Sequence, residues 1–320
     1  MLAGLARGAV GLADAVTTRR VSILIFHRVL PQADPLFPGE MHAARFDRLM
    51  GILARGFNVL TLGQALALRA EDRLPPRALV ITFDDGYADN ADVALPILQR
   101  HGLRATFFVS SGFLDGGRMW NDTVIEAVRA SAAGALPAGL FGLAALPLGT
   151  PDDRRKAIEA LLGKLKYLTL GEREASLRQL LAAFGNPHLP HGLMMRSNQV
   201  LQLHAAGMEI GGHTVHHPIL RVLPDTEARA EIAEGRERLQ AVIDAPVSVF
   251  AYPNGRPGQD YDARHVAMVR QLGFSGAVST SPGAALGTDD AFELPRFTPW
   301  DRSTVRWVGR LMYQRLRGRR

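Results

Sequence analysis

The chain has 320 residues, of which 47% are hydrophobic and 21% are charged, a composition that excludes a disordered protein and suits one large α/β barrel or two ordinary domains. It contains no cysteine, which excludes disulfides and thiolate chemistry and leaves histidine and carboxylate as the ligands of any metal. The formal net charge is +6, and residues 301–320 carry seven arginines and one aspartate, so this excess belongs to the C-terminal tail.

The N-terminal segment, residues 1–20, is predicted to be a short helix or a frayed terminus. The uninterrupted apolar run between Arg7 and Asp14, residues 8–13, is too short for the core of a signal peptide. No segment has the roughly 18 consecutive apolar residues of a transmembrane helix. We therefore expect a cytoplasmic or membrane-peripheral protein.

Residues 21–300 alternate between buried strands and helices. The predicted strands cover residues 21–26, 57–60, 79–83, 105–109, 208–212, 247–251, 275–279 and 293–297. The predicted helices cover residues 43–55, 62–70, 92–101, 199–206, 227–243 and 264–272. This alternation predicts an α/β fold with a parallel sheet and helices outside it.

Residues 118–197 depart from the alternation. They begin near Trp120 and Asp122, which are candidates for lining a site, and become strongly helical over residues 152–184. We interpret the segment as a helical insertion in the barrel rather than a separate domain. Because loops at the end of a barrel carry substrate contacts, the insertion either binds substrate or is a passive structural cover.

Two adjacent carboxylates, Asp84 and Asp85, follow the strand over residues 79–83 and precede Gly86. Buried carboxylates are costly unless a metal, a cation or a role in proton transfer compensates them. Neighbouring side chains of an extended chain point to opposite faces, so one carboxylate can bind a metal while the other approaches the metal-bound water. The alternative is a turn in which one aspartate caps the next helix.

Three histidines, His213, His216 and His217, follow the predicted strand over residues 208–212. On a helix, His213 would share a face with either of the other two, so spacing alone does not choose the pair. Two histidines and one carboxylate leave open positions on a divalent ion, which is typical of a catalytic site. Zinc is the default ion, and the same ligands suit iron, cobalt or nickel.

The carboxyl ends of the strands in a closed parallel barrel form one face, where barrel enzymes place their active sites. His27 and Tyr252 also follow predicted strands. We therefore expect these two residues to converge with Asp84, Asp85 and His213.

These motifs together resemble the polysaccharide deacetylases, the NodB-homology group of carbohydrate esterases. The resemblance spans roughly residues 20–300 and rests on residues 82–87 (TFDDGY) and 213–218 (HTVHHP), with a weaker match at residues 250–255 (FAYPNG). It implies a distorted (β/α)7-type barrel with the helical insertion. It also implies a metal-dependent hydrolase that removes N-acetyl groups from amino sugars of a bacterial polysaccharide and releases acetate.

The resemblance assigns Asp85, His213 and His217 as metal ligands and Asp84 as general base. At the third motif the family usually has an arginine and a tyrosine, where this chain has Ala251 and Asn254.

A main-chain N–H does not depend on the side chain, and Pro253 has none, so the N–H of Asn254 is the candidate oxyanion donor. A plain turn is the alternative.

Two further roles follow from what the chain lacks. Arg296, near the end of a late strand, is our hypothesis for the missing arginine that orients the catalytic aspartate. The family's late Leu-x-His is also absent, because the segment over residues 294–296 reads Leu-Pro-Arg. His27 lies in a Phe-His-Arg-Val segment that resembles the opening of exopolysaccharide and poly-N-acetylglucosamine deacetylases, which makes it the candidate general acid. A buried structural histidine is the alternative.

The expected partner is an N-acetylated oligo- or polysaccharide. A carbohydrate O-acetyl esterase and a non-catalytic carbohydrate-binding protein remain alternatives on the same fold. Residues 301–320 predict a basic amphipathic helix, either in peripheral contact with a membrane or docked on the protein with its arginines solvated. Nucleic acid is not an expected partner, because no basic patch accompanies the catalytic motifs.

Overall fold

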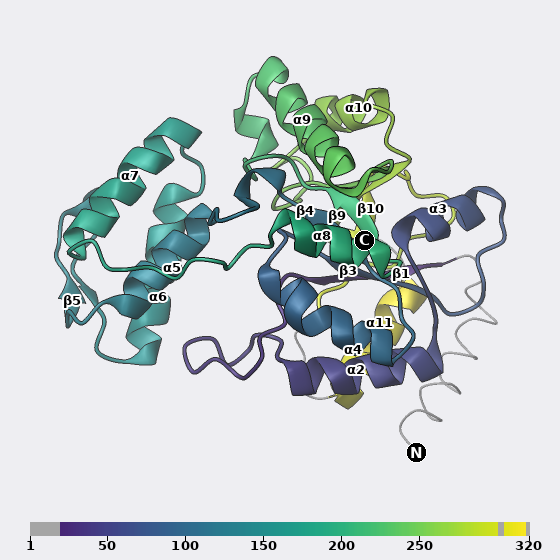
Figure 1. The fold of residues 1–320 in the computed structure, drawn as a ribbon, viewed down its shortest axis with the longest axis horizontal. Helices are drawn as coiled ribbons and strands as arrows, with labels where there is room; N and C mark the ends of the chain where they lie inside the picture. The colour runs from purple at the N-terminus through teal and green to yellow at the C-terminus, as the bar shows by residue number, and fades with distance from the viewer. Residues whose placement is uncertain (1–19, 300–303, 318–320) are drawn as a thin grey trace.

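A computed structural model describes residues 20–299 and 304–317 (Figure 1). Seven parallel strands form a sheet in the order β1-β3-β4-β7-β8-β9-β10. They are β1 (Ser22–Phe26), β3 (Ala78–Phe83), β4 (Thr106–Val109), β7 (Glu209–Gly212), β8 (Val249–Ala251), β9 (Gly276–Pro282) and β10 (Leu294–Arg296). β2 (Asn58–Leu60) pairs with β3 outside this order.

The two ends of the sheet meet at a parallel bridge between Leu24 and Phe297. There the N–H of Ile25 donates to the Phe297 carbonyl at 3.0 Å, and the N–H of Phe297 donates to the Ile23 carbonyl at 2.7 Å. The sheet is thus nearly closed into a barrel, and the prediction of a distorted (β/α)7-type barrel is confirmed.

Helices cover the outside of the barrel: α2 (Ala43–Gly56), α3 (Leu62–Ala70), α4 (Leu95–Arg100), α8 (Ser197–Ala205), α9 (Asp225–Ile243) and α10 (Ala263–Gln271). α3 begins at a capping box, in which Thr61 and Gln64 satisfy each other's backbone N–H groups. The helix predicted over residues 92–101 is α4 preceded by a π-helical turn over Asn90–Ala94.

Alternate residues of β3 face two different hydrophobic cores. Leu79, Ile81 and Phe83 join the large core beneath the outer helices. Ala78 and Val80 join the smaller core on the other face of the sheet. This period of two is the one expected of a strand buried on both faces.

Three helices between β4 and β7 form a lobe beside the barrel (Figure 1): α5 (Trp120–Ala130), α6 (Pro151–Leu165) and α7 (Leu170–Ala183). The lobe has its own apolar core, which includes Val124, Leu161 and Leu180. It also contains a short antiparallel pair, β5 (Ala135–Leu136) and β6 (Leu146–Pro147), which the sequence did not predict. The long helical stretch divides because Thr169 forms a capping box with Glu172 and begins α7.

The last helix, α11 (Thr304–Arg317), is docked on the protein. Trp307, Leu311 and Met312 belong to the large core. The buried Arg315 donates to the Ser22 hydroxyl at 3.1 Å and to the Ala78 carbonyl at 3.0 Å. The helix is therefore docked, as the second alternative expects, but Arg315 is buried and not solvated.

The predictions for residues 1–19, 301–303 and 318–320 lie outside the described residues. Within the described part of the chain, no helix is long and apolar enough to cross a membrane.

Candidate active site

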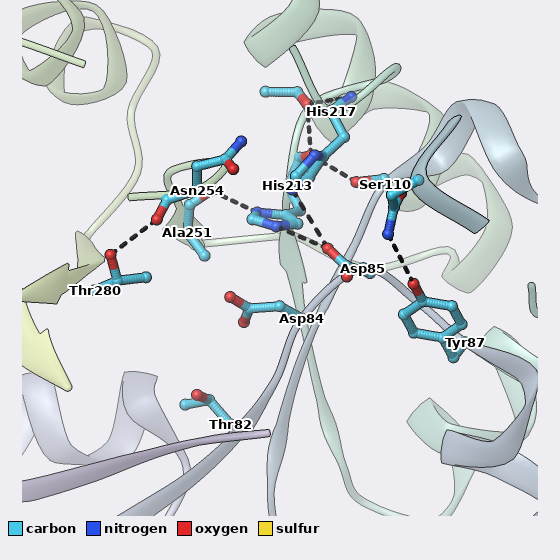
Figure 2. A network of polar contacts seen from close by, with 12 residues as sticks. Thr82, Asp84, Asp85, Tyr87, Ser110, His213, His217, Ala251, Asn254 and Thr280 are labelled. Carbon is cyan, nitrogen blue, oxygen red and sulfur yellow. Dashed lines mark hydrogen bonds and ion pairs between the residues drawn. The ribbon is translucent and has the colours of Figure 1, made fainter. Parts of the chain in front are cut away.

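The predicted metal ligands Asp85, His213 and His217 lie together at the carboxyl ends of β3 and β7 (Figure 2). The Asp85 Oδ1 atom is 3.4 Å from the Nε2 atom of each histidine. The two imidazole ring centroids are 4.8 Å apart. The three side chains thus turn their ligand atoms toward one small space.

The spacing of these atoms fits a shared ion better than a hydrogen bond. A separation of 3.4 Å is longer than a normal N–H···O bond. Two ligands placed tetrahedrally at about 2.1 Å from one ion lie about 3.4 Å apart. The Nδ1 atom of His213 donates to the Ala251 carbonyl at 2.7 Å, which leaves its Nε2 lone pair directed toward Asp85. A divalent ion therefore fits the residues present.

The electrostatics of the cluster also suit a cation. Burial works against the charged form of Asp85, yet the neighbouring His213 and His217 hold its pKa well below the usual range. Burial would lower the pKa of His213, but the adjacent Asp85 and Asp84 carboxylates raise it. Burial lowers the pKa of His217 to about 4, which leaves this imidazole neutral and able to act as a ligand near neutral pH.

The histidines lie on a loop, so the helical-face argument does not describe their geometry. His217 adopts the left-handed region with φ 52°, and its N–H donates to the Thr214 hydroxyl at 3.1 Å. His216 points to Glu231 of α9, whose carboxylate lies 2.7 Å from its Nδ1. Glu231 also accepts the N–H of Val215 at 3.0 Å. The loop therefore pairs His217, and not His216, with His213.

The second carboxylate, Asp84, forms a buried ion pair with Arg296 of β10. Both guanidinium Nη atoms donate to Asp84, at 2.6 Å and 2.7 Å. Arg296 also donates to the Ser279 carbonyl at 2.8 Å and to the Thr82 hydroxyl at 3.2 Å. Burial works against ionisation of Asp84, but Arg296 holds its pKa below the usual range. Arg296 thus lies where the sequence hypothesis placed a substitute for the missing arginine.

The two carboxylates diverge for a reason that differs from the expected one (Figure 2). β3 ends at Phe83, so the two residues are not in extended chain. Asp85 adopts a left-handed φ of 78°, which is uncommon for a residue other than glycine. This turn, and not the pleat of a strand, separates Asp85 from Asp84.

The remaining predicted residues border the same site. His27 is exposed just after β1, and its charge acts on the pKa values of Asp84 and Asp85. Asn254 lies on the turn after β8, with φ 58°, and its carbonyl accepts a hydrogen bond from the Thr280 hydroxyl at 2.8 Å (Figure 2). Within the described part of the chain, the Asn254 N–H has no hydrogen-bond partner. His27 and Asn254 line one cleft.

The expectation that Tyr252 converges on the site is wrong. Its side chain is fully buried, stacks on Tyr261 with ring centroids 3.8 Å apart, and donates to the Phe292 carbonyl at 3.0 Å. The side chain of a residue that follows a strand reaches the barrel mouth only when the turn directs it there. The turn after β8 directs its backbone, and not the Tyr252 side chain, toward the barrel mouth.

A further buried carboxylate lies beside the cluster. Asp122 of α5 accepts a hydrogen bond from the Tyr87 hydroxyl at 3.2 Å, and burial raises the pKa of Asp122 to about 7. Its Oδ2 atom is buried without a partner among the described residues. With His27 and Asp85 it lines a pocket of about 230 Å³.

A family model and a curated protein both match this chain. The family model described as "Polysaccharide deacetylase" matches residues 71–134 and 178–277, about half of the chain. The curated Bacillus subtilis (strain 168) protein YxkH, named as a member of the polysaccharide deacetylases, is 21% identical over 278 residues, which are 87% of this chain and 70% of that protein.

Two solved structures share the fold. The Streptococcus pyogenes deacetylase PplD, in complex with acetate, has a TM-score of 0.59 at 18% identity, covering 88% of this chain and 93% of that one. IcaB from Ammonifex degensii has a TM-score of 0.58 at 18% identity, covering 93% and 97%. With the family model matched across both halves of the barrel, the chain belongs to the polysaccharide deacetylase family of hydrolases.

Proposed function

We propose that this chain hydrolyses N-acetyl groups on the amino sugars of a polysaccharide and releases acetate. The observation that carries the proposal is that a set of metal ligands lies next to a carboxylate held by an arginine. Asp85, His213 and His217 are spaced for one divalent ion, and Asp84 lies beside them in a bidentate pair with Arg296. When bound, such an ion, with zinc as the first candidate, would lower the pKa of a water molecule and polarise a carbonyl.

Asp84 is the proposed general base. It accepts a proton from the water that attacks the acetamide carbon. Arg296 occupies one acceptor position on each carboxylate oxygen, at 2.6 Å and 2.7 Å, and each oxygen keeps a second lone pair. Arg296 is therefore a positioning residue that keeps Asp84 ionised and fixed.

The other two roles fall to residues that follow β8 and β1. The N–H of Asn254 donates to the oxyanion that develops as the carbonyl becomes tetrahedral. The backbone of Asn254 is in the left-handed region, and its carbonyl accepts a hydrogen bond from the Thr280 hydroxyl. This conformation directs the Asn254 N–H toward the barrel mouth. His27, exposed at the cleft, donates a proton to the leaving amine.

The test is acetate release from N-acetylglucosamine oligosaccharides, with and without a chelator. Asp84→Asn is expected to bind metal normally and to lose about 10²–10⁴-fold in kcat, the usual contribution of general acid–base catalysis. Asp92→Asn, a change of an aspartate outside the site, is the matched control. Turnover that survives in Asp84→Asn would refute the base assignment. A preference for acetate esters over acetamides would refute the reaction class.

A further inference from the structure

A long cleft opens at the proposed catalytic residues and runs toward the helical lobe. It has a volume of about 870 Å³, within the range of small-molecule binding sites. His27 and Asn254 lie on its wall near the barrel mouth. Two residues of the lobe also line it: Arg155, near the start of α6, and Lys166, which follows the end of that helix. A glycan that places one sugar at the catalytic centre would lay its neighbours along this cleft.

The charged residues of this cleft are mostly cations. They are Arg28, Arg45, Arg155, Lys166 and Arg256, against a single carboxylate, Glu40.

Some of that charge is neutralised within the protein. Arg28 pairs with Asp89 at 2.8 Å, and Arg155 pairs with Asp152. Lys166 and Arg256, by contrast, have no carboxylate partner among the described residues.

Arg256 holds a defined position relative to the chemistry. It lies two residues beyond Asn254 on the same turn, and its own N–H is held by the buried Asp260 at 3.0 Å. Its side chain is exposed. Lys166 lines the same cleft, and its ammonium lies 5.6 Å from the ring centroid of Tyr167. Both cations therefore line the cleft along which a bound glycan would lie.

The balance of charge differs between the two pockets that His27 lines. The second pocket, which shares Arg28 and Glu40 with the cleft, contains five carboxylates and two guanidinium groups. Those carboxylates are Asp34, Glu40, Asp85, Asp122 and Glu126. A negatively charged sugar would thus be favoured beside Lys166 and Arg256 over the second pocket.

We propose that this cleft binds an anionic sugar, so that the substrate is an acidic polysaccharide in which an N-acetylated amino sugar lies next to a sugar bearing a carboxylate or a phosphate. The inference rests on the proposed deacetylase function and names the class of its substrate. Guanidinium and ammonium groups form charge-assisted hydrogen bonds with both anions, which makes either chemistry a match for Lys166 and Arg256.

The experiment compares acetate release from three oligosaccharides of equal length: a neutral chito-oligosaccharide, a heparosan oligosaccharide with glucuronate, and a phosphodiester-linked N-acetylglucosamine oligosaccharide. Lys166→Met and Arg256→Gln are each expected to raise KM for the preferred acidic substrate about tenfold, with kcat unchanged. For the neutral substrate, KM should stay within about twofold. High salt should reduce the preference, because exposed charges are screened.

Two exposed cations outside the cleft provide matched controls, Lys164→Met on α6 and Arg178→Gln on α7, and neither should alter KM. The acidic substrate that responds to the cleft variants identifies carboxylate or phosphate as the anion. Equal kcat/KM for neutral and acidic substrates, with no effect of either cleft variant, would overturn this inference and leave the deacetylase function intact. No acetate from any of the three would count against the deacetylase function itself.

Discussion

Replacing Arg296 by methionine tests whether the buried ion pair holds Asp84 in its charged form. The guanidinium is 0% exposed and the Asp84 side chain 3% exposed, so neither charge is screened by water. Methionine keeps much of the volume but removes both bonds to the carboxylate. Asp84 is then left as an uncompensated buried charge.

The expected loss of unfolding free energy follows from that burial. Breaking a buried ion pair by removing one partner typically costs about 3–5 kcal/mol of unfolding free energy. The Ser279 carbonyl also loses the donor that now lies 2.8 Å away. We therefore expect Arg296→Met to lose about 3–5 kcal/mol. The double variant Arg296→Met/Asp84→Asn should recover about half of that loss, because it no longer buries a charge.

The assay is urea unfolding of the two single variants and the double variant, with a chelator present so that metal loss does not contribute. Arg100→Met is the matched control, since its pair with Asp47 is exposed and should be worth less than about 1 kcal/mol. The reasoning is refuted if Arg296→Met costs no more than Arg100→Met. The reasoning is also refuted if the losses of unfolding free energy in the two single variants add up to the loss in the double variant.

Three further outcomes follow from the structure. His217→Ala should lose bound metal in elemental analysis after dialysis while His216→Ala retains it, and equal retention would contradict the ligand assignment. Trp307→Ala should cost about 3–5 kcal/mol in urea unfolding, against less than about 1 kcal/mol for the half-exposed Tyr313→Ala, and similar costs would argue against a docked α11. Asp122 has a folded pKa of about 7 against about 3.9 unfolded, so the stability that its neutral form provides is complete below about pH 4 and is lost as pH rises to 7. Asp122→Asn should therefore gain up to about 4 kcal/mol relative to wild type between pH 4 and pH 8, and a pH-independent difference would show that Asp122 ionises normally.

The strand pattern made the barrel predictable from the sequence. Each buried run of β-branched and aromatic residues is short and is followed by a helix, and this combination leaves few arrangements other than a parallel sheet. The antiparallel pair β5 and β6 was missed because each strand has only two residues and carries no periodicity. The division between α6 and α7 was missed because the signal was one threonine, Thr169, within a stretch rich in helix-forming residues.

The ligand types were predictable, but the way in which they are held was not. Glu231 fixes the histidine loop from the middle of α9, 15 residues beyond His216, and nothing in the local sequence marks it. Arg296 could be placed only as a hypothesis, because its pairing with Asp84 joins residues 212 positions apart. Tyr252 was misplaced because position after a strand does not determine the direction of a side chain.

The central claim is that Asp85, His213 and His217 hold one divalent ion in the active enzyme. The most direct measurement is anomalous diffraction from crystals of the zinc-loaded, active protein, recorded on both sides of the zinc absorption edge. We predict a single peak about 2 Å from the Nε2 atoms of both histidines and from the Asp85 carboxylate. Full activity in a protein whose crystals show no peak between these three residues would contradict the claim.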